Sequence, residues 1–235
     1  MDKRRTLGVV TPTTAAELAK FIDHTLLAPE ATRDEALAVC RDAIAWQVAA
    51  VCISPSWLPL PAGAMRGGVR LCTVAGFPSG AHTSAAKANE AANSVRDGAE
   101  EIDMVVNLGL VRAGDWNAVE AEVRAVRNAI DAVASKRLLK VICESAALSD
   151  DELRNTCRAA VASGADFVKT STGFHKAGGA NERAVAIMRE TVGDGVGVKA
   201  SGGIRTTEAA LAMIAAGATR IGASATREIL SGMPS

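Results

Sequence analysis

The same junction between a helix and a strand occurs three times along the chain, and it constrains the fold more than any other feature. The three copies are Gly98-Ala-Glu-Glu-Ile-Asp103, Gly164-Ala-Asp-Phe-Val-Lys169 and Gly217-Ala-Thr-Arg-Ile-Gly222. Glycine readily adopts the left-handed conformation that ends a helix and turns the chain into the next element. A junction repeated in this way predicts alternating strands and helices, and therefore a parallel sheet.

Eight strand candidates alternate with helices along the sequence. The strands are predicted at 21–28, 48–53, 69–74, 101–106, 138–143, 166–169, 196–199 and 220–222, and the helices at 13–20, 32–46, 83–97, 115–134, 149–163, 181–192, 206–217 and from 224 onward. This pattern predicts an α/β fold, a single (β/α)8 TIM barrel with a short extra N-terminal helix. Residues 1–12 are expected to be a flexible leader, and 13–235 the barrel and catalytic domain. An open doubly wound sheet is the alternative, but it favours an early G-x-G-x-x-G loop, which the sequence lacks.

Composition narrows the partners that the chain is expected to have. Lys plus Arg and Asp plus Glu both number 26, which argues against nucleic-acid or membrane-surface binding, because such proteins carry a basic surplus. No run reaches the roughly 18 apolar residues of a membrane span, and no signal peptide is recognised. Five scattered cysteines without Cys-x-x-Cys spacing predict reduced thiols in a cytoplasmic protein.

Two lysines end successive predicted strands. Lys169 and Lys199 are each followed by small or polar residues, at positions that form the mouth of a parallel barrel. A free lysine has a pKa near ~10.4, so about one amine in 2500 is neutral at pH 7, and only the neutral amine attacks a carbonyl. A second ammonium ~5 Å away disfavours protonation by roughly 3 kcal/mol at an effective dielectric near 20. We therefore expect Lys199 to activate Lys169 as a Schiff-base nucleophile. The alternative is that both side chains simply extend to solvent.

Carboxylates stand near the ends of other predicted strands. Asp103 lies between apolar residues, where a carboxylate is costly unless it is paired. It is expected to act as a general acid/base or to pair with a buried lysine, and these interpretations overlap if that lysine is catalytic. For Glu144, a strand-end salt bridge explains the position about as well as a catalytic role does. Asp23 and Cys52 are expected on the same rim as candidates for substrate contact.

Two glycine turns predict a phosphate site. Ser201-Gly202-Gly203 follows the seventh strand, and Gly222-Ala-Ser224 follows the eighth and opens a helix. Backbone amides at such turns bind phosphate, and barrels often use these two loops for it. His24, His82 and His175 lack metal-ligand spacing, so no metal site is predicted.

Several motifs together resemble the deoxyribose-phosphate aldolase family: Ile22-Asp-His-Thr-Leu-Leu27, Gly76-Phe-Pro78 with Lys87, Glu101-Ile-Asp-Met-Val-Val-Asn107 with Gly114-Asp-Trp116, Lys140-Val-Ile142, Val168-Lys-Thr-Ser-Thr-Gly173 and Val198-Lys-Ala-Ser-Gly-Gly-Ile-Arg205. The resemblance implies a class I aldolase on a (β/α)8 barrel. It would cleave 2-deoxy-D-ribose 5-phosphate to glyceraldehyde 3-phosphate and acetaldehyde in deoxynucleoside catabolism, without a cofactor or metal.

The same resemblance implies roles for individual residues. Lys169 would be the Schiff-base lysine, with Asp103 and Lys199 as the proton relay. The phosphate and substrate region would contain Gly173, Gly202, Gly203, Ser224, Thr170, Asp23 and Cys52. The expected partners are a sugar phosphate and aldehydes, with no nucleic acid and no membrane, and the chain is expected to form a homo-oligomer, either a dimer or a tetramer.

Three other functions fit the same residues. The first is a Schiff-base barrel aldolase that uses a different acceptor. The second is a sugar-phosphate sensor that keeps the pocket without catalysis, and the third is an isomerase. Neither of the last two would form a covalent adduct on Lys169.

Overall fold

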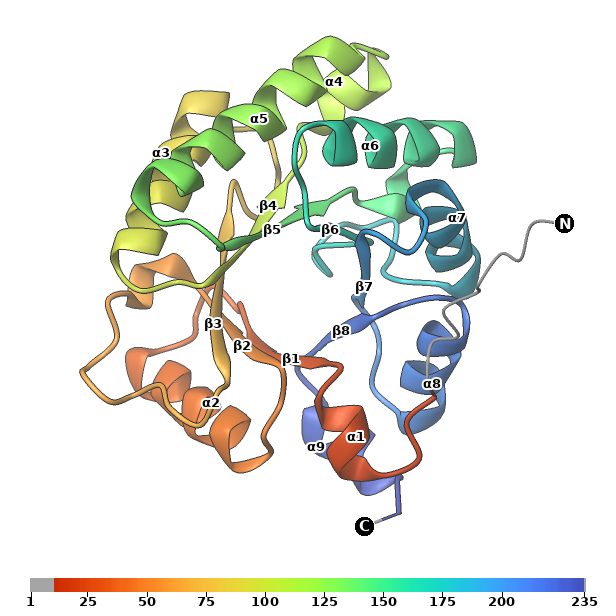
Figure 1. Ribbon diagram of the computed structural model, residues 1–235. Coiled ribbons are helices and arrows are strands. Elements are labelled where there is room, and N and C mark those ends of the chain that lie inside the picture. The colour runs from red at the N-terminus through yellow and green to blue at the C-terminus, as the bar shows by residue number, and fades with distance from the viewer. Residues whose placement is uncertain (1–10, 235) are drawn as a thin grey trace, which may run out of the picture.

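The strands close into a barrel whose order around the ring follows the sequence, from β1 to β8, with the helices outside it (Figure 1). A computed structural model describes residues 11–234. The strands are β1 (Ile22–Leu26), β2 (Ala50–Ile53), β3 (Arg70–Ala75), β4 (Glu101–Val105), β5 (Leu138–Ile142), β6 (Phe167–Lys169), β7 (Gly197–Ser201) and β8 (Arg220–Ala223). All neighbouring pairs are parallel, including β1 with β8. The predicted (β/α)8 TIM barrel is confirmed.

The helices form the outer layer. They are α1 (Ala15–Ala19), α2 (Arg33–Ala45), α3 (Ser84–Arg96), α4 (Leu108–Arg112), α5 (Trp116–Val133), α6 (Asp150–Ala162), α7 (Glu182–Val192), α8 (Thr207–Ala215) and α9 (Thr226–Ser231), with single 3-10 turns η1 (Pro55–Trp57) and η2 (Ser145–Ala147). The short extra helix at the N-terminus is α1. The predicted leader, 1–12, lies almost entirely outside the described residues.

Local sequence signals set the ends of several helices. Thr32 with Glu35, and Ser149 with Glu152, form the capping boxes that the sequence predicts at the starts of α2 and α6. Each box satisfies two backbone N–H groups that the first turn leaves unpaired. At the other end, Gly98 has φ +104° and Gly217 has φ +113°, so the repeated glycine junctions turn the chain as expected.

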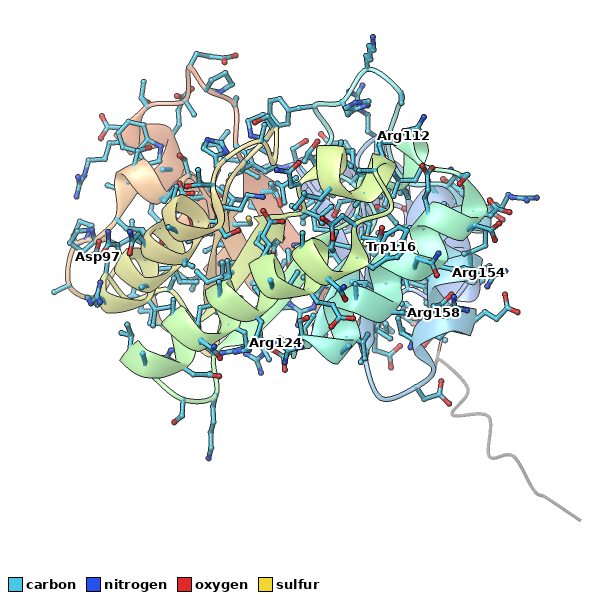
Figure 2. The ribbon with its side chains drawn as sticks, turned by 90° about the horizontal axis from the view of Figure 1, so that it is seen from above. Asp97, Arg112, Trp116, Arg124, Arg154 and Arg158 are labelled. Carbon is cyan, nitrogen blue, oxygen red and sulfur yellow. The ribbon has the colours of Figure 1, made fainter. Side chains whose placement is uncertain are left out.

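One face of each long outer helix packs on the barrel. On α5, fully buried Val119, Val123, Val126 and Ile130 recur at the three- and four-residue spacing of a single helix face. Burying each such side chain contributes roughly 1.5–3 kcal/mol. The opposite faces carry charge, and Figure 2 shows Arg124 on α5 and Arg154 and Arg158 on α6 at the outer surface.

The inside of the barrel holds charged side chains where barrels usually hold branched apolar ones. Alternate strand residues point to the same side of a sheet, so Glu101 and Asp103 on β4 face inward together. Lys140 on β5 is paired in register with Asp103, and Lys169 with Lys199. The buried inward-facing charged residues are Asp23, Glu101, Asp103, Lys140, Lys169, Lys199 and Arg220.

The structure corrects two details of the sequence-based prediction. Lys199 and Asp103 lie in the middle of their strands, because β7 continues to Ser201 and β4 to Val105. Only Lys169 of the three predicted catalytic residues is the last residue of its strand. Helix α4 was not predicted; it is a five-residue helix that Asn107 caps by accepting a hydrogen bond from the Gly109 N–H, at 2.9 Å.

Within residues 11–234, no helix has both the length and the apolar character that crossing a bilayer requires.

Candidate active site

A cavity of about 510 Å³ opens at the C-terminal ends of the strands. Its wall is built from β1, β6, β7, β8 and the loops that follow them. The lining includes Thr25, Leu27, Glu30, Lys169, Thr172, Gly173, Phe174, Ser201, Gly202, Gly203, Arg205, Gly222 and Ser224. Lysine, hydroxyl groups and glycine turns therefore face one enclosed space, as expected of a site for a small polar ligand.

Lys169, Asp103 and Lys199 meet at the base of this cavity. Lys169 Nζ and Lys199 Nζ each lie 2.8 Å from the same atom, Asp103 Oδ2. The two nitrogens are therefore separated by at most twice that distance. The structure brings the three predicted catalytic residues together, and Lys169 is the member of this group that lines the cavity.

Asp103 is the centre of the buried ion pairs. Its other oxygen, Oδ1, accepts from Lys140 Nζ at 2.7 Å and from the Cys72 thiol at 3.3 Å. Burial raises the pKa of a carboxyl group, but the Lys140, Lys169 and Lys199 charges outweigh burial and hold the Asp103 pKa well below its usual range. The Asp103 side chain is therefore ionised at neutral pH. Any proton that it accepts comes from one of the groups that already donate hydrogen bonds to it.

A second group of ion pairs supports the first. Asp23 lies 2.5 Å from Lys199 Nζ and 2.6 Å from the Arg220 guanidinium. Glu101 lies 2.6 Å from Lys140 Nζ and 3.4 Å from Arg220. Burial lowers the pKa of a cationic side chain, yet these carboxylates together with Asp103 raise the pKa values of Lys140, Lys199 and Arg220. All three therefore remain cations at neutral pH.

A count of these charges distinguishes Lys169 from the other buried cations. Three carboxylates balance three cations that stay protonated: Asp23, Glu101 and Asp103 against Lys140, Lys199 and Arg220. Lys169 is the fourth basic group, and its salt bridge is to Asp103 alone. Lys169 therefore shares its one carboxylate with Lys140 and Lys199, whereas each of those two lysines also contacts a second carboxylate.

The predicted phosphate residues all belong to the wall of the cavity. Gly173, Gly202, Gly203 and Ser224 all line it, with Arg205 on the same rim. The loops after β6 and β7 touch through glycine: a Cβ at Gly179 would overlap the Gly202 carbonyl oxygen. Gly202 itself has φ +92°, a conformation that glycine adopts without strain. Close approach of these two loops exposes backbone to a ligand.

Three predicted substrate contacts lie outside the wall of the cavity. The Thr170 hydroxyl donates to the Ser201 carbonyl at 3.1 Å and accepts from the Ser201 N–H at 2.9 Å, so it joins the ends of β6 and β7. Asp23 is fully buried between Lys199 and Arg220. Cys52 is fully buried in a small cluster beside Cys72. Their positions fit support of the site rather than direct contact.

Glu144 does not form the strand-end salt bridge that was one interpretation of its position. Within residues 11–234 its carboxylate has no salt-bridge partner, although its exposed fraction is 1%. Instead, Oε2 accepts from the Thr172 hydroxyl at 2.5 Å, and Oε1 from the Thr172 N–H at 3.2 Å. Glu144 also has φ +58°, in the left-handed region that non-glycine residues rarely adopt.

Potential metal donors inside the barrel already contact a cation. The ligand atoms of Cys52, Cys72 and Asp103 lie within 4.8 Å of one another. Lys140 Nζ lies 3.3 Å from Cys72 Sγ and 2.7 Å from Asp103 Oδ1. The Lys140 ammonium therefore takes the place where a cation would sit among these donors.

Sequence reasoning missed Lys140, Glu101 and Arg220 as parts of the site. Glu101 and Arg220 are the first residues of β4 and β8, and Lys140 is in the middle of β5. Glu101 precedes Asp103 by two positions, the spacing of one sheet face, so a search for charges at alternate strand positions would have found Glu101.

Comparison with known proteins gives a consistent result. Residues 18–232 match the model of the family described as DeoC/LacD family aldolase. A protein named deoxyribose-phosphate aldolase from Kocuria rhizophila is 56% identical over 94% of this chain and 99% of its own length. Another of that name, from Nocardia farcinica, is 54% identical over 94% of this chain and 97% of its own. The tetrameric deoxyribose phosphate aldolase of Aeropyrum pernix superposes with a TM-score of 0.87 at 32% identity, covering 96% of this chain and 94% of that one.

Proposed function

The chain belongs to the DeoC/LacD family of aldolases, and from that premise we propose how its residues catalyse the reversible cleavage of 2-deoxy-D-ribose 5-phosphate to D-glyceraldehyde 3-phosphate and acetaldehyde. The observation that carries the proposal is the shared acceptor, Asp103 Oδ2, which lies 2.8 Å from both Lys169 Nζ and Lys199 Nζ. It supports a lysine nucleophile with a carboxylate and an ammonium placed for proton transfer.

The first half of the reaction forms the covalent intermediate. Neutral Lys169 attacks the C1 aldehyde of the open-chain sugar and gives a carbinolamine. To complete the carbinolamine, Asp103 takes a proton from the attacking nitrogen and passes it to the alkoxide oxygen. Lys199 then supplies a proton to the departing hydroxyl, water leaves, and the nitrogen keeps its remaining hydrogen, so that a cationic iminium forms. Because Asp103 contacts both amines, a proton can pass between them without entering bulk water.

The second half breaks the carbon–carbon bond. The Asp103–Lys199 pair, which gave up a proton in the first half, takes the C3 hydroxyl proton. The C3 carbonyl forms, and the C2–C3 bonding electrons move into the iminium to give an enamine on Lys169. Glyceraldehyde 3-phosphate departs. The same pair returns that proton to C2, which regenerates the iminium. Addition of water then releases acetaldehyde and the free amine, and the proton set free in this step goes back to the pair. The buried Asp103–Lys199 pair returns to its starting protonation state at the end of the cycle.

The phosphate is assigned to the opposite side of the cavity. The backbone at Gly173, Gly202 and Gly203, with the Ser224 hydroxyl, offers donors to an anion, and Arg205 adds a positive charge at the rim. This arrangement suits a substrate with a carbonyl at one end and a phosphate at the other.

Borohydride trapping tests the proposal. Acetaldehyde followed by borohydride should add one reduced two-carbon group to the protein, and peptide mapping should place it on Lys169. Lys169→Arg should abolish both the adduct and the turnover, while replacement of exposed Lys20 with alanine serves as the matched control. Sugar phosphate binding without an adduct would instead support a sensor or an isomerase.

The oligomeric state, the cellular compartment and the partners are proposed from other observations. The tetramer recorded for the Aeropyrum pernix relative supports a homo-oligomer, either a dimer or a tetramer, which light scattering after size exclusion would measure. Five buried, unbridged cysteines support a reducing cytoplasmic compartment. We assign residues 13–235 as the catalytic unit, its substrate as a sugar phosphate from deoxyribonucleoside catabolism, and no nucleic-acid partner.

A further inference from the structure

Glu144 is a buried carboxylate that the proposed mechanism does not use. Its exposed fraction is 1%, it has no salt-bridge partner among residues 11–234, and its backbone is left-handed. A buried carboxylate without a cation is costly, and a left-handed backbone at a non-glycine residue adds to that cost. The only side chain that Glu144 hydrogen bonds in the described part of the chain is that of Thr172, which lines the same cavity as Lys169.

The contacts around Thr172 fix the direction of its hydroxyl. A threonine hydroxyl has one proton to donate and two lone pairs that accept. Its proton goes to Glu144 Oε2 at 2.5 Å, because a carboxylate can only accept. One lone pair accepts from the Phe174 N–H at 3.1 Å. A single acceptor position is therefore left for a ligand, and no donor.

We propose that Glu144 is a positioning residue that makes the Thr172 hydroxyl an obligate hydrogen-bond acceptor, and that this acceptor selects substrates with a hydroxyl donor between the reacting carbonyl and the phosphate. The inference rests on the proposed function. Thr172 lines the same cavity as Lys169 and Gly173, and in the chain it follows Lys169 by three residues and directly precedes Gly173. The C4 hydroxyl keeps its proton throughout the reaction, so it suits a fixed acceptor that is itself a poor base.

The Glu144→Gln variant reverses the direction of the hydrogen bond between residue 144 and the Thr172 hydroxyl, while the side chain keeps nearly the same shape. In the native site one oxygen accepts the Thr172 N–H at 3.2 Å while the other accepts the hydroxyl at 2.5 Å. If the glutamine carbonyl keeps the N–H bond, its NH₂ group faces the hydroxyl and must donate to it. The Thr172 proton is then released toward the cavity, and the site offers a donor where it offered an acceptor.

The measurement compares two acceptor aldehydes, one with a hydroxyl and the other with a methoxy group on the same carbon. Enzyme and acetaldehyde are mixed with lactaldehyde, whose hydroxyl can donate, or with 2-methoxypropanal, whose ether oxygen can only accept, and kcat/KM is determined for each acceptor. The native protein should prefer lactaldehyde, and Glu144→Gln should lower that preference by about three- to tenfold, the effect of one ordinary hydrogen bond. The matched control is Glu190→Gln, which makes the same chemical change on an exposed side chain of α7. Thr172→Val should lose the preference and Thr172→Ser should keep it.

Each outcome bears on the inference. An unchanged preference in Glu144→Gln, or no preference in the native protein, overturns it. If Glu144→Gln does not fold, Glu144→Gly replaces it, because glycine adopts φ +58° without strain and leaves the Thr172 hydroxyl unheld; a retained preference there also overturns the inference. Borohydride trapping on Lys169 separates the two proposals: an adduct with an unchanged preference leaves the aldolase mechanism standing, whereas no adduct removes the proposed function itself.

Discussion

Lys169 and Lys199 point their side-chain nitrogens at one carboxylate oxygen, and each nitrogen lies 2.8 Å from it. That oxygen belongs to Asp103, so the two amines are bridged by a negative charge rather than left as bare neighbours. Sequence reasoning treated repulsion between the two ammonium groups as the main effect. In the structure, the Lys199 charge is paired with both Asp103 and Asp23, whereas Lys169 has a salt bridge to Asp103 alone.

Replacement of Asp103 with asparagine is expected to impair chemistry more than binding. The amide keeps the size of the side chain but cannot hold the charge that links Lys169 and Lys199. Loss of one general acid/base should lower kcat by about a hundredfold to ten-thousandfold with a small change in KM. Steady-state kinetics of deoxyribose 5-phosphate cleavage measures this, with the exposed Asp131→Asn as the control. An unchanged kcat would remove Asp103 from the mechanism.

Lys140→Met is expected to lower stability strongly. The methionine fills a similar space but removes the nearest cation of both Glu101 and Asp103, which lie 2.6 and 2.7 Å from Lys140 Nζ. Breaking a buried ion pair from one side costs roughly 3–5 kcal/mol, measured here as the free energy of unfolding in urea. Adding Glu101→Gln to Lys140→Met should recover part of the loss, because the two sites are coupled. Additive losses in the double variant would contradict the coupling.

Stability should fall in acid because of the buried carboxylates. Burial raises their pKa values, but the neighbouring cations hold those of Asp23 and Asp103 below the usual value of about 3.9. A lowered pKa stabilises the folded state above the unfolded-state pKa, and this contribution is lost as the pH falls through the folded-state value. The free energy of unfolding should therefore decline below about pH 4, and more steeply in the native protein than in Asp103→Asn. Equal slopes in the two proteins would argue against this origin.

In mildly alkaline solution, Lys140 and Lys199 should not lower the free energy of unfolding. Burial lowers the Lys140 and Lys199 pKa values, but the carboxylates around them raise both above the usual ~10.4. A raised pKa gives stability that is fully present below ~10.4 and is lost as the pH rises through the folded-state value. Urea unfolding between pH 7 and 10 should thus show no loss from these two groups. A decline over that range in the native protein, absent from Lys199→Met, would contradict the assignment.

Gly179→Ala is expected to weaken phosphate binding. A Cβ there would overlap the Gly202 carbonyl oxygen and force the loops after β6 and β7 apart. The KM for deoxyribose 5-phosphate should rise more than the KM for phosphate-free deoxyribose, with a smaller effect on kcat. Gly195→Ala is the matched control, because a Cβ at Gly195 meets nothing within 4 Å. Equal increases in KM for both sugars would indicate general distortion of the cavity.

The sequence predicted the barrel because its signals are local and repeated. The capping boxes at Thr32 and Ser149 and the glycine junctions each act within a few residues, and their alternation leaves few ways to close the sheet. Lys169, Asp103 and Lys199 could be predicted as catalytic residues because a charged side chain in an apolar strand is costly unless it is paired or has a function. These residues do converge at the base of the cavity.

Other features depend on contacts between distant residues, and the sequence did not show them. The pairing of Glu144 with Thr172 spans 28 positions, and that of Asp23 with Arg220 spans 197. The spacing of apolar residues along helices and strands carries no information about such pairs. Thr170 was expected to face the substrate, but register between β6 and β7 turns its hydroxyl to the Ser201 backbone. Helix α4 is as short as α1, but it contains Gly109 and has no capping box such as the one formed by Thr14 and Glu17 at the start of α1.

Lys169 is the last residue of β6 and lines the cavity, whereas the other inward-facing charged residues of the barrel do not line it. Three lysines converge inside the barrel, yet a small electrophile that enters from the mouth encounters one of them first. An aldehyde in the cavity therefore reaches Lys169, because neither Lys140 nor Lys199 lines the cavity. Those two lysines can take part in the reaction only by exchanging protons with Lys169.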